Sequence, residues 1–216
     1  MTFRLTQIDE LIRGQHYYLE VGDLCYFFGE YTARQRAAFS ETNQLIMNLK
    51  KGNERRGLQD YHYKGAAINR VAQMITSTIG NISDYTFVPI PPSKCRTDEA
   101  YDDRMTAILR AAQGMNPALD FRELVQQNLS TVASHASTAN RPTPDEIMAN
   151  YSFDSSQLHG IRGSIVIFDD VLTAGSHFKA MKKFLRQYLP DANILGLFVA
   201  RTAREADLTS LFELLD

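Results

Sequence analysis

Residues 163–177 read Gly-Ser-Ile-Val-Ile-Phe-Asp-Asp-Val-Leu-Thr-Ala-Gly-Ser-His, and they constrain the fold more than any other segment. Four consecutive apolar residues, 165–168, are typical of a short strand that is buried on both faces. Two carboxylates, Asp169 and Asp170, follow directly, and then come a turn of small and hydroxyl-bearing residues and a helical pattern. This order predicts a parallel strand that ends in an acidic pair, followed by a loop that opens a helix.

The same order of residues predicts a ligand site. Ligands of open α/β sheets bind outside the carboxyl ends of the strands, and a helix N-terminus offers free N–H groups and a positive dipole end to a phosphate. Carboxylates one step earlier suit the hydroxyls of a sugar. We therefore expect a ribose 5-phosphate site, with Asp169 and Asp170 at the sugar. The loop residues expected at the phosphate are Thr173, Ala174, Gly175, Ser176 and His177.

This segment resembles the signature with which type I phosphoribosyltransferases hold 5-phosphoribosyl 1-pyrophosphate (PRPP). That pattern is four apolar residues, two acids, two apolar residues and a Thr/Gly-rich loop; its last position, usually Thr or Ser, is His177 here. The resemblance implies an α/β type I phosphoribosyltransferase fold, a mostly parallel sheet flanked by helices with an N-terminal hood. It also implies Mg²⁺ as cofactor, held through the substrate with Asp169 and Asp170 as candidate protein ligands, and transfer of the ribosyl group to a nitrogenous acceptor.

A second loop supports the resemblance and narrows it. Residues 88–96 read Val-Pro-Ile-Pro-Pro-Ser-Lys-Cys-Arg, which is similar to the pyrophosphate loop of ComF-type phosphoribosyltransferases. The resemblance places Ser93, Lys94 and Arg96 at the pyrophosphate; taken alone, the two cations would favour an ordinary solvated loop. The chain departs from that family in lacking a cysteine-rich zinc ribbon and in carrying Tyr-Asp-Asp-Arg at 101–104.

Residues 129–142 lack a clear periodicity, which in a compact α/β domain favours a lid or a disordered segment. His135 and Arg141 are its ionisable residues, and we expect them either to act on the pyrophosphate or acceptor or to be exposed and idle. Arg201, after the last expected strand, is a candidate contact to the acceptor base, with surface solvation as the alternative. The identity of the acceptor cannot be read from the sequence.

Composition excludes several classes of protein. The chain has 216 residues, 44% of them hydrophobic, and a net charge of −2, so direct nucleic-acid binding is not expected. Cys25 and Cys95 form no Cys-x-x-Cys pair, which favours reduced thiols and a cytoplasmic protein. No signal peptide and no membrane-spanning run is expected. By analogy with the fold, a homodimer is possible.

Hydrophobic periodicity predicts the remaining elements. A core over 81–216 follows N-terminal elements over 1–80 that form the hood packed on it. We expect a hairpin over 17–32, and strands at 86–90, 121–125, 165–168 and 194–200. Helices are expected at 41–51, 64–79, 98–113 and 175–189, a short helix after the Thr143–Glu146 capping box, and an element of uncertain type at 208–215.

Three functions stay open. The first is an active phosphoribosyltransferase, and the second is a PRPP- or nucleotide-binding regulatory module without turnover. The third is a ComF-like accessory protein in DNA handling, against which the near-neutral charge argues. A buried strand with a capped helix and no ligand is the structural alternative for 163–177. A P-loop nucleotidase is excluded because the sequence has no Gly-x-x-x-x-Gly-Lys-Ser/Thr segment.

Overall fold

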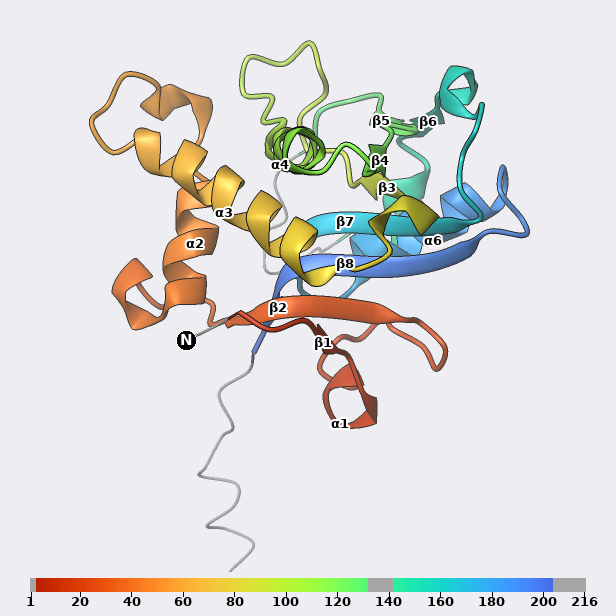
Figure 1. Ribbon diagram of the computed structural model, residues 1–216, viewed down its shortest axis with the longest axis horizontal. Helices are drawn as coiled ribbons and strands as arrows, with labels where there is room; N and C mark the ends of the chain where they lie inside the picture. The colour runs from red at the N-terminus through yellow and green to blue at the C-terminus, as the bar shows by residue number, and fades with distance from the viewer. Residues whose placement is uncertain (1–2, 132–141, 204–216) are drawn as a thin grey trace, which may run out of the picture.

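The computed structural model describes residues 3–131 and 142–203 and shows an α/β fold built on a six-stranded, mostly parallel sheet (Figure 1). The strand order is β1-β2-β8-β7-β3-β4, and every neighbouring pair is parallel except β1 and β2. The bounds are β1 Thr6–Gln7, β2 Cys25–Tyr31, β3 Tyr85–Pro89, β4 Asp120–Phe121, β7 Ser164–Leu172 and β8 Asn193–Thr202. Two further strands, β5 Val125–Gln127 and β6 Tyr151–Phe153, form a small antiparallel sheet.

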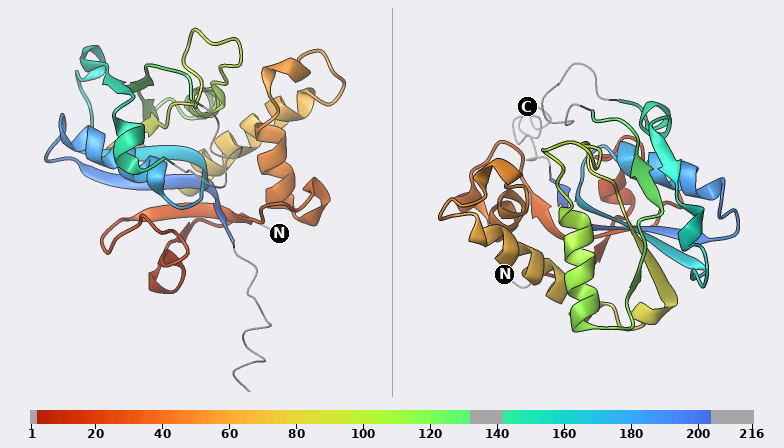
Figure 2. Two further views of the ribbon diagram at one scale, coloured as in Figure 1. Left: turned by 180° about the vertical axis from the view of Figure 1, so that it is seen from behind. Right: turned by 90° about the horizontal axis from the view of Figure 1, so that it is seen from above.

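Helices cover both faces of the large sheet, as the front view of Figure 1 and the rear view of Figure 2 show. The bounds are α1 Glu10–Arg13, α2 Glu41–Leu49, α3 His62–Thr78, α4 Arg104–Met115, α5 Pro144–Met148 and α6 Ser176–Arg186. Short 3₁₀ turns lie at Ala37–Phe39, Asn53–Arg55, Ile82–Asp84 and Ser155–Gln157. Helices α2, α3 and α4 pack on one face and α5 and α6 on the other, so each face has its own core.

Strand β7 illustrates how the sequence makes this double core. Its side chains alternate between the faces, so Ile165 and Ile167 join the core beneath α6, while Val166 and Phe168 join the core beneath α4. Ile165, Ile167 and Phe168 have no exposed surface and Val166 is 6% exposed. A continuous apolar run is therefore required here, because both faces of a central parallel strand are covered.

The connections diverge between β3 and β7. From β3 the chain passes through α4 to β4, at one edge of the sheet, whereas from β7 it passes through α6 to β8 in the opposite direction. Because α4 and α6 lie on opposite faces, the loops after β3 and β7 part and leave a crevice at the carboxyl ends of these two strands. Such a switch point is where open α/β sheets bind ligands.

Several predicted elements are confirmed: helices near 41–51 and 64–79, strands near 86–90 and 194–200, and the capping box at Thr143, which opens α5. Helix α4 begins at Arg104 rather than 98 because turns occupy the residues before it. The apolar strand predicted at 165–168 runs on to Leu172, so the acidic pair lies within β7 and not after it. The element predicted at 208–215 lies outside the described residues.

Two strand predictions are wrong. Residues 17–24 form turns, and β2 pairs instead with the upstream β1 and, over most of its length, with β8. The strand predicted at 121–125 is split between two sheets: β4 ends at Phe121 on β3, and β5 begins at Val125 and pairs with β6. The first 80 residues therefore contribute β1 and β2 to the sheet as well as α2 and α3 on its face.

Candidate functional site: a polar cavity at the β3–β7 switch point

A cavity of about 150 Å³ opens at the carboxyl ends of β3 and β7. Its wall is formed by the loop after β3, the start of α4, the end of β7, the start of α6 and Lys50 at the end of α2. Most of the sequence-predicted site residues meet here. Those that line it are Ser93, Lys94, Arg96, Asp169, Asp170, Thr173 and His177.

The acidic pair is divided between the two faces of the sheet. Asp169 accepts a hydrogen bond from the backbone N–H of Asp170 at 2.8 Å, and its side chain lies on the side of α6. Burial, followed by the charge of Asp170, raises the pKa of Asp169 to about 7. Asp170, which is 5% exposed, lies on the side of α4, where cations surround it. The pair therefore offers one carboxyl with a raised pKa and one that is paired with Arg104 and Lys50.

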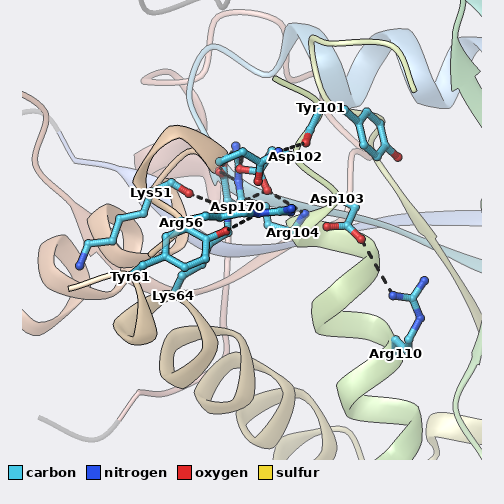
Figure 3. A network of polar contacts seen from close by, with 11 residues as sticks. Lys51, Arg56, Tyr61, Lys64, Tyr101, Asp102, Asp103, Arg104, Arg110 and Asp170 are labelled. Carbon is cyan, nitrogen blue, oxygen red and sulfur yellow. Dashed lines mark hydrogen bonds and ion pairs between the residues drawn. The ribbon is translucent and has the colours of Figure 1, made fainter. Parts of the chain in front are cut away.

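Arg104 is the main partner of Asp170 (Figure 3). Its Nε and Nη2 both donate to Oδ2 of Asp170, at 3.0 and 2.7 Å, and Nζ of Lys50 lies 3.6 Å from the other carboxylate oxygen. Arg104 also donates from Nη1 to Asp102 at 2.8 Å. The charges of Asp170 and Asp102 raise the pKa of the Arg104 guanidinium against the effect of its burial, so the group stays cationic.

The expected phosphate loop is tightly braced. Gly175, the N-cap of α6, has a φ of +86°, a conformation that side-chain-bearing residues rarely adopt. The backbone N–H of Tyr18 donates to the carbonyl oxygen of Ala174 at 2.8 Å, and a ring nitrogen of His16 bonds that of Thr173. Segment 16–19 thus fixes this loop from behind, while Thr173 and His177 face the cavity. Ala174, Gly175 and Ser176 are not among its lining residues.

The expected pyrophosphate loop is held by side chains. Nζ of Lys94 lies 3.8 Å from Asp98, and Arg96 forms an ion pair with Glu123 at 2.9 Å. Ser93 accepts hydrogen bonds at its carbonyl oxygen from Gln127 at 2.6 Å and from the backbone of Thr131 at 2.8 Å. The two cations face the cavity but are already paired, so an anion would exchange with carboxylates.

Some predicted residues do not join the site. Arg201 is 6% exposed, donates to Gln15 at 2.9 Å, pairs with Glu30 and lies over the ring of Phe27. The prediction that it contacts the acceptor base is therefore not supported, because Arg201 is absent from the cavity wall. His135 and Arg141 lie outside the described residues.

Several residues of the wall were not predicted from the sequence, and three of them are charged residues that contact or flank the acidic pair. Lys50, Asp102 and Arg104 reach the cavity from α2, from the turn before α4 and from the first residue of α4. The sequence holds features that could have drawn attention to them. Lys50 lies at the end of a predicted helix, and Asp102 and Arg104 lie in the stretch that departs from the ComF pattern. No short-range pattern pairs Arg104 with Asp170, which is 66 residues away.

Carboxylate oxygens, the ligands Mg²⁺ prefers, are present in the wall on Asp102, Asp103, Glu123, Asp169 and Asp170. Within residues 3–131 and 142–203 no three acidic, His or Cys side chains cluster closely enough to hold a metal ion together. Individual carboxylates of this wall are of the type that coordinates Mg²⁺.

The fold and the site define an α/β protein with a mostly parallel, Rossmann-like sheet and a polar cavity at its switch point. Comparison with protein family models and with curated proteins finds no match to this chain. Among the described helices none combines the length and the apolar character needed to cross a membrane.

Proposed function

We propose that this chain is a phosphoribosyltransferase of the type I, ComF-like kind, which binds PRPP with Mg²⁺ and transfers its ribosyl 5-phosphate group to a nitrogenous acceptor. One observation carries the proposal: the acidic pair of β7, the loop that opens α6 and the cationic loop after β3 line a single cavity. These three elements are the ones that the sequence resemblance assigns to sugar, phosphate and pyrophosphate.

Different residues of the cavity suit different groups of PRPP. Thr173, His177 and the N–H groups at the start of α6 suit the 5-phosphate. Lys94 and Arg96 suit the pyrophosphate through charge-assisted hydrogen bonds, once they exchange their carboxylate partners. Asp169 and Asp170 accept the ribose hydroxyls. Mg²⁺, bound through the phosphates, adds charge neutralisation of the leaving group.

The reaction requires little covalent catalysis by the protein. The bond between the anomeric carbon and pyrophosphate oxygen breaks with its electron pair leaving on pyrophosphate, a bond to the acceptor nitrogen forms, and that nitrogen loses its proton. Positive charge develops on the ribosyl ring in between, next to the carboxylates of β7. Positioning and electrostatic stabilisation therefore supply the rate. We place this chemistry in the cytoplasm, since Cys25 and Cys95 are free thiols.

A non-catalytic PRPP-binding module is the second candidate. It is favoured by the ion pairs that the charged residues of the site form with one another: Arg104 with Asp170, and Arg96 with Glu123. Each ligand group then has to compete with a protein group, which weakens binding and suits a sensor that fills at high PRPP concentration. Binding and turnover must be measured separately to choose between the two.

Calorimetric titration of PRPP with Mg²⁺ tests the site. Wild type and the Asp145→Asn/Asp191→Asn control, which removes two exposed carboxylates far from the cavity wall, should bind alike. Asp169→Asn/Asp170→Asn should lose binding while circular dichroism shows it folded. Equal binding by all three proteins would refute the site, and absent binding to wild type would refute the proposal. Pyrophosphate release with purine and pyrimidine acceptors then separates enzyme from module.

A further inference from the structure

A chain of buried charges connects the N-terminal half of the molecule to the acidic pair (Figure 3). Lys64 in the first turn of α3 is 6% exposed, and its Nζ donates to Asp102 at 2.8 Å and to the carbonyl oxygen of Lys51 at 2.6 Å. Asp102 also accepts from the backbone N–H and Nη1 of Arg104, at 3.2 and 2.8 Å. Arg104 then bonds Asp170.

The geometry of Arg104 fixes Asp170 in one orientation. Two donors, Nε and Nη2, converge on a single oxygen, Oδ2, which leaves Oδ1 on the side of Lys50. The third donor, Nη1, holds the guanidinium plane on Asp102. A planar guanidinium with three donors in use has little freedom to turn, so the carboxylate that it holds has little freedom either.

We propose that Arg104 is the positioning residue of Asp170, and that the Lys64–Asp102 pair keeps Arg104 in place. This inference rests on the proposed function, since Asp170 is the group offered to the ribose. Lys64 is absent from the cavity wall, so it acts on the ligand only through Asp102 and Arg104. Helix α3, which precedes β3, thereby sets the geometry of a site whose wall comes almost entirely from residues 89–177.

Stability alone does not account for this arrangement. Desolvation offsets much of the attraction in a buried ion pair, so such pairs are weakly stabilising compared with apolar replacements. Here two carboxylates and two cations are gathered at and directly behind the wall of the cavity, where apolar side chains would serve a core equally well. Their value lies in a carboxylate that is correctly oriented before the ligand arrives.

Variants of the three residues test the inference through PRPP·Mg²⁺ titration. Arg104→Met should weaken binding about tenfold or more, because Asp170 loses its charge-assisted hydrogen bonds. Arg104→Lys, which restores charge but not the planar fork, should recover part of the loss. Lys64→Met and Asp102→Asn should each cost about threefold alone and nothing further in the Arg104→Met background, as expected for residues in one chain. The matched control is Arg110→Met, on the same helix but paired only loosely with Asp103.

Two results would overturn the inference when the wild type binds PRPP. One is that the losses of affinity from Lys64→Met and Arg104→Met multiply in the double variant, and the other is that Arg104→Met binds with wild-type affinity. A ligand-free measurement separates this inference from the proposed function. In ¹⁵N NMR the Arg104 Nε–H signal should be protected from exchange, and Lys64→Met and Asp170→Asn should each shift it, while Arg110→Met leaves it in place. An unmoved signal in both variants refutes the chain of contacts even if PRPP binds. Shifted signals without any PRPP binding refute only the proposed function.

Discussion

The two loops that meet at the cavity are held in different ways. The β7 half-site, residues 169–177, is braced through its backbone: the carbonyl oxygens of Thr173 and Ala174 accept hydrogen bonds from segment 16–18, and Gly175 supplies a left-handed turn. The β3 half-site, residues 90–104, is held mainly by side-chain pairs with distant residues, such as Arg96 with Glu123 and Arg104 with Asp170.

The β7 half-site is therefore preformed, whereas in the β3 half-site the charged side chains must change partners when a ligand binds. Backbone bracing persists when a ligand binds, because it uses no group that the ligand needs. Side-chain pairs at the cavity wall use the same charges that a phosphorylated ligand would engage, so binding requires their exchange. We therefore expect substitutions in the β7 half-site to change stability most, and substitutions at the exposed pairs of residues 94–98 in the β3 half-site to change local chemistry with little effect on stability.

The largest effect is expected from Gly175→Val. A Cβ at this position would lie 3.1 Å from Cδ2 of Leu19, and φ is +86°. Both a clash and an unfavourable backbone conformation result, which together should cost about 3 kcal/mol of unfolding free energy. Urea denaturation measures the loss. Gly65→Val is the control, because Gly65 has a helical φ and open space around it.

A companion variant tests the role of segment 16–19. Leu19→Ala leaves a cavity in the core and is destabilising on its own. Combined with Gly175→Val it should relieve the clash but not the backbone strain, so the double variant should lose less stability than the sum of the two single losses. A Gly175→Val protein as stable as wild type would show that the loop is not braced from behind. The comparison between the two half-sites would then lose its basis.

The motif at 163–177 made the β7 half-site predictable, because its elements are contiguous in sequence. The apolar run, the acidic pair and the small-residue turn each follow from local physics. The β3 half-site was predictable only as a loop with Lys94 and Arg96. Its contacts with Glu123, Asp102 and Asp170 depend on how α3, α4 and β7 pack, and no sequence period reports such packing. The hairpin prediction failed for the same reason, since β2 pairs with β8, about 170 residues further along the chain.

The second prediction concerns Asp169. Its pKa in the folded protein, about 7, lies above the ordinary value of 3.8, chiefly because burial disfavours the charged form. The contribution of this group to stability is therefore complete below about pH 4 and is lost as pH rises through 7. Between pH 5 and pH 8 the wild type should lose on the order of 2 kcal/mol relative to Asp169→Asn. Urea denaturation across this pH range gives the difference.

Asp170→Asn is the comparison variant for that titration. It removes the partner of Arg104 and should destabilise the protein at neutral pH. It also removes a charge that raises the pKa of Asp169, so its relative gain between pH 5 and pH 8 should be present but smaller than that of Asp169→Asn. If the stability difference between wild type and Asp169→Asn is flat with pH, Asp169 is already ionised in the folded protein. The two carboxylates would then be equivalent, contrary to their separation onto opposite faces of the sheet.

The smallest effect on stability is expected in the β3 half-site, where Cys95 reports on side-chain hydrogen bonds. Ser130 Oγ donates to its Sγ at 3.3 Å, and Thr97 Oγ1 lies at the same distance. These hydrogen bonds, led by that from Ser130, lower the pKa of the Cys95 thiol to about 7. Ser130→Ala should therefore raise this pKa and shift the pH midpoint of iodoacetamide alkylation upward, with the melting temperature almost unchanged. The buried Cys25 thiol, whose pKa is raised by burial, is the internal control, since it should stay unmodified in both proteins.

An unchanged alkylation midpoint in Ser130→Ala would mean that the loop is not held by these side chains. The contrast between the two half-sites would then lose its support at Cys95.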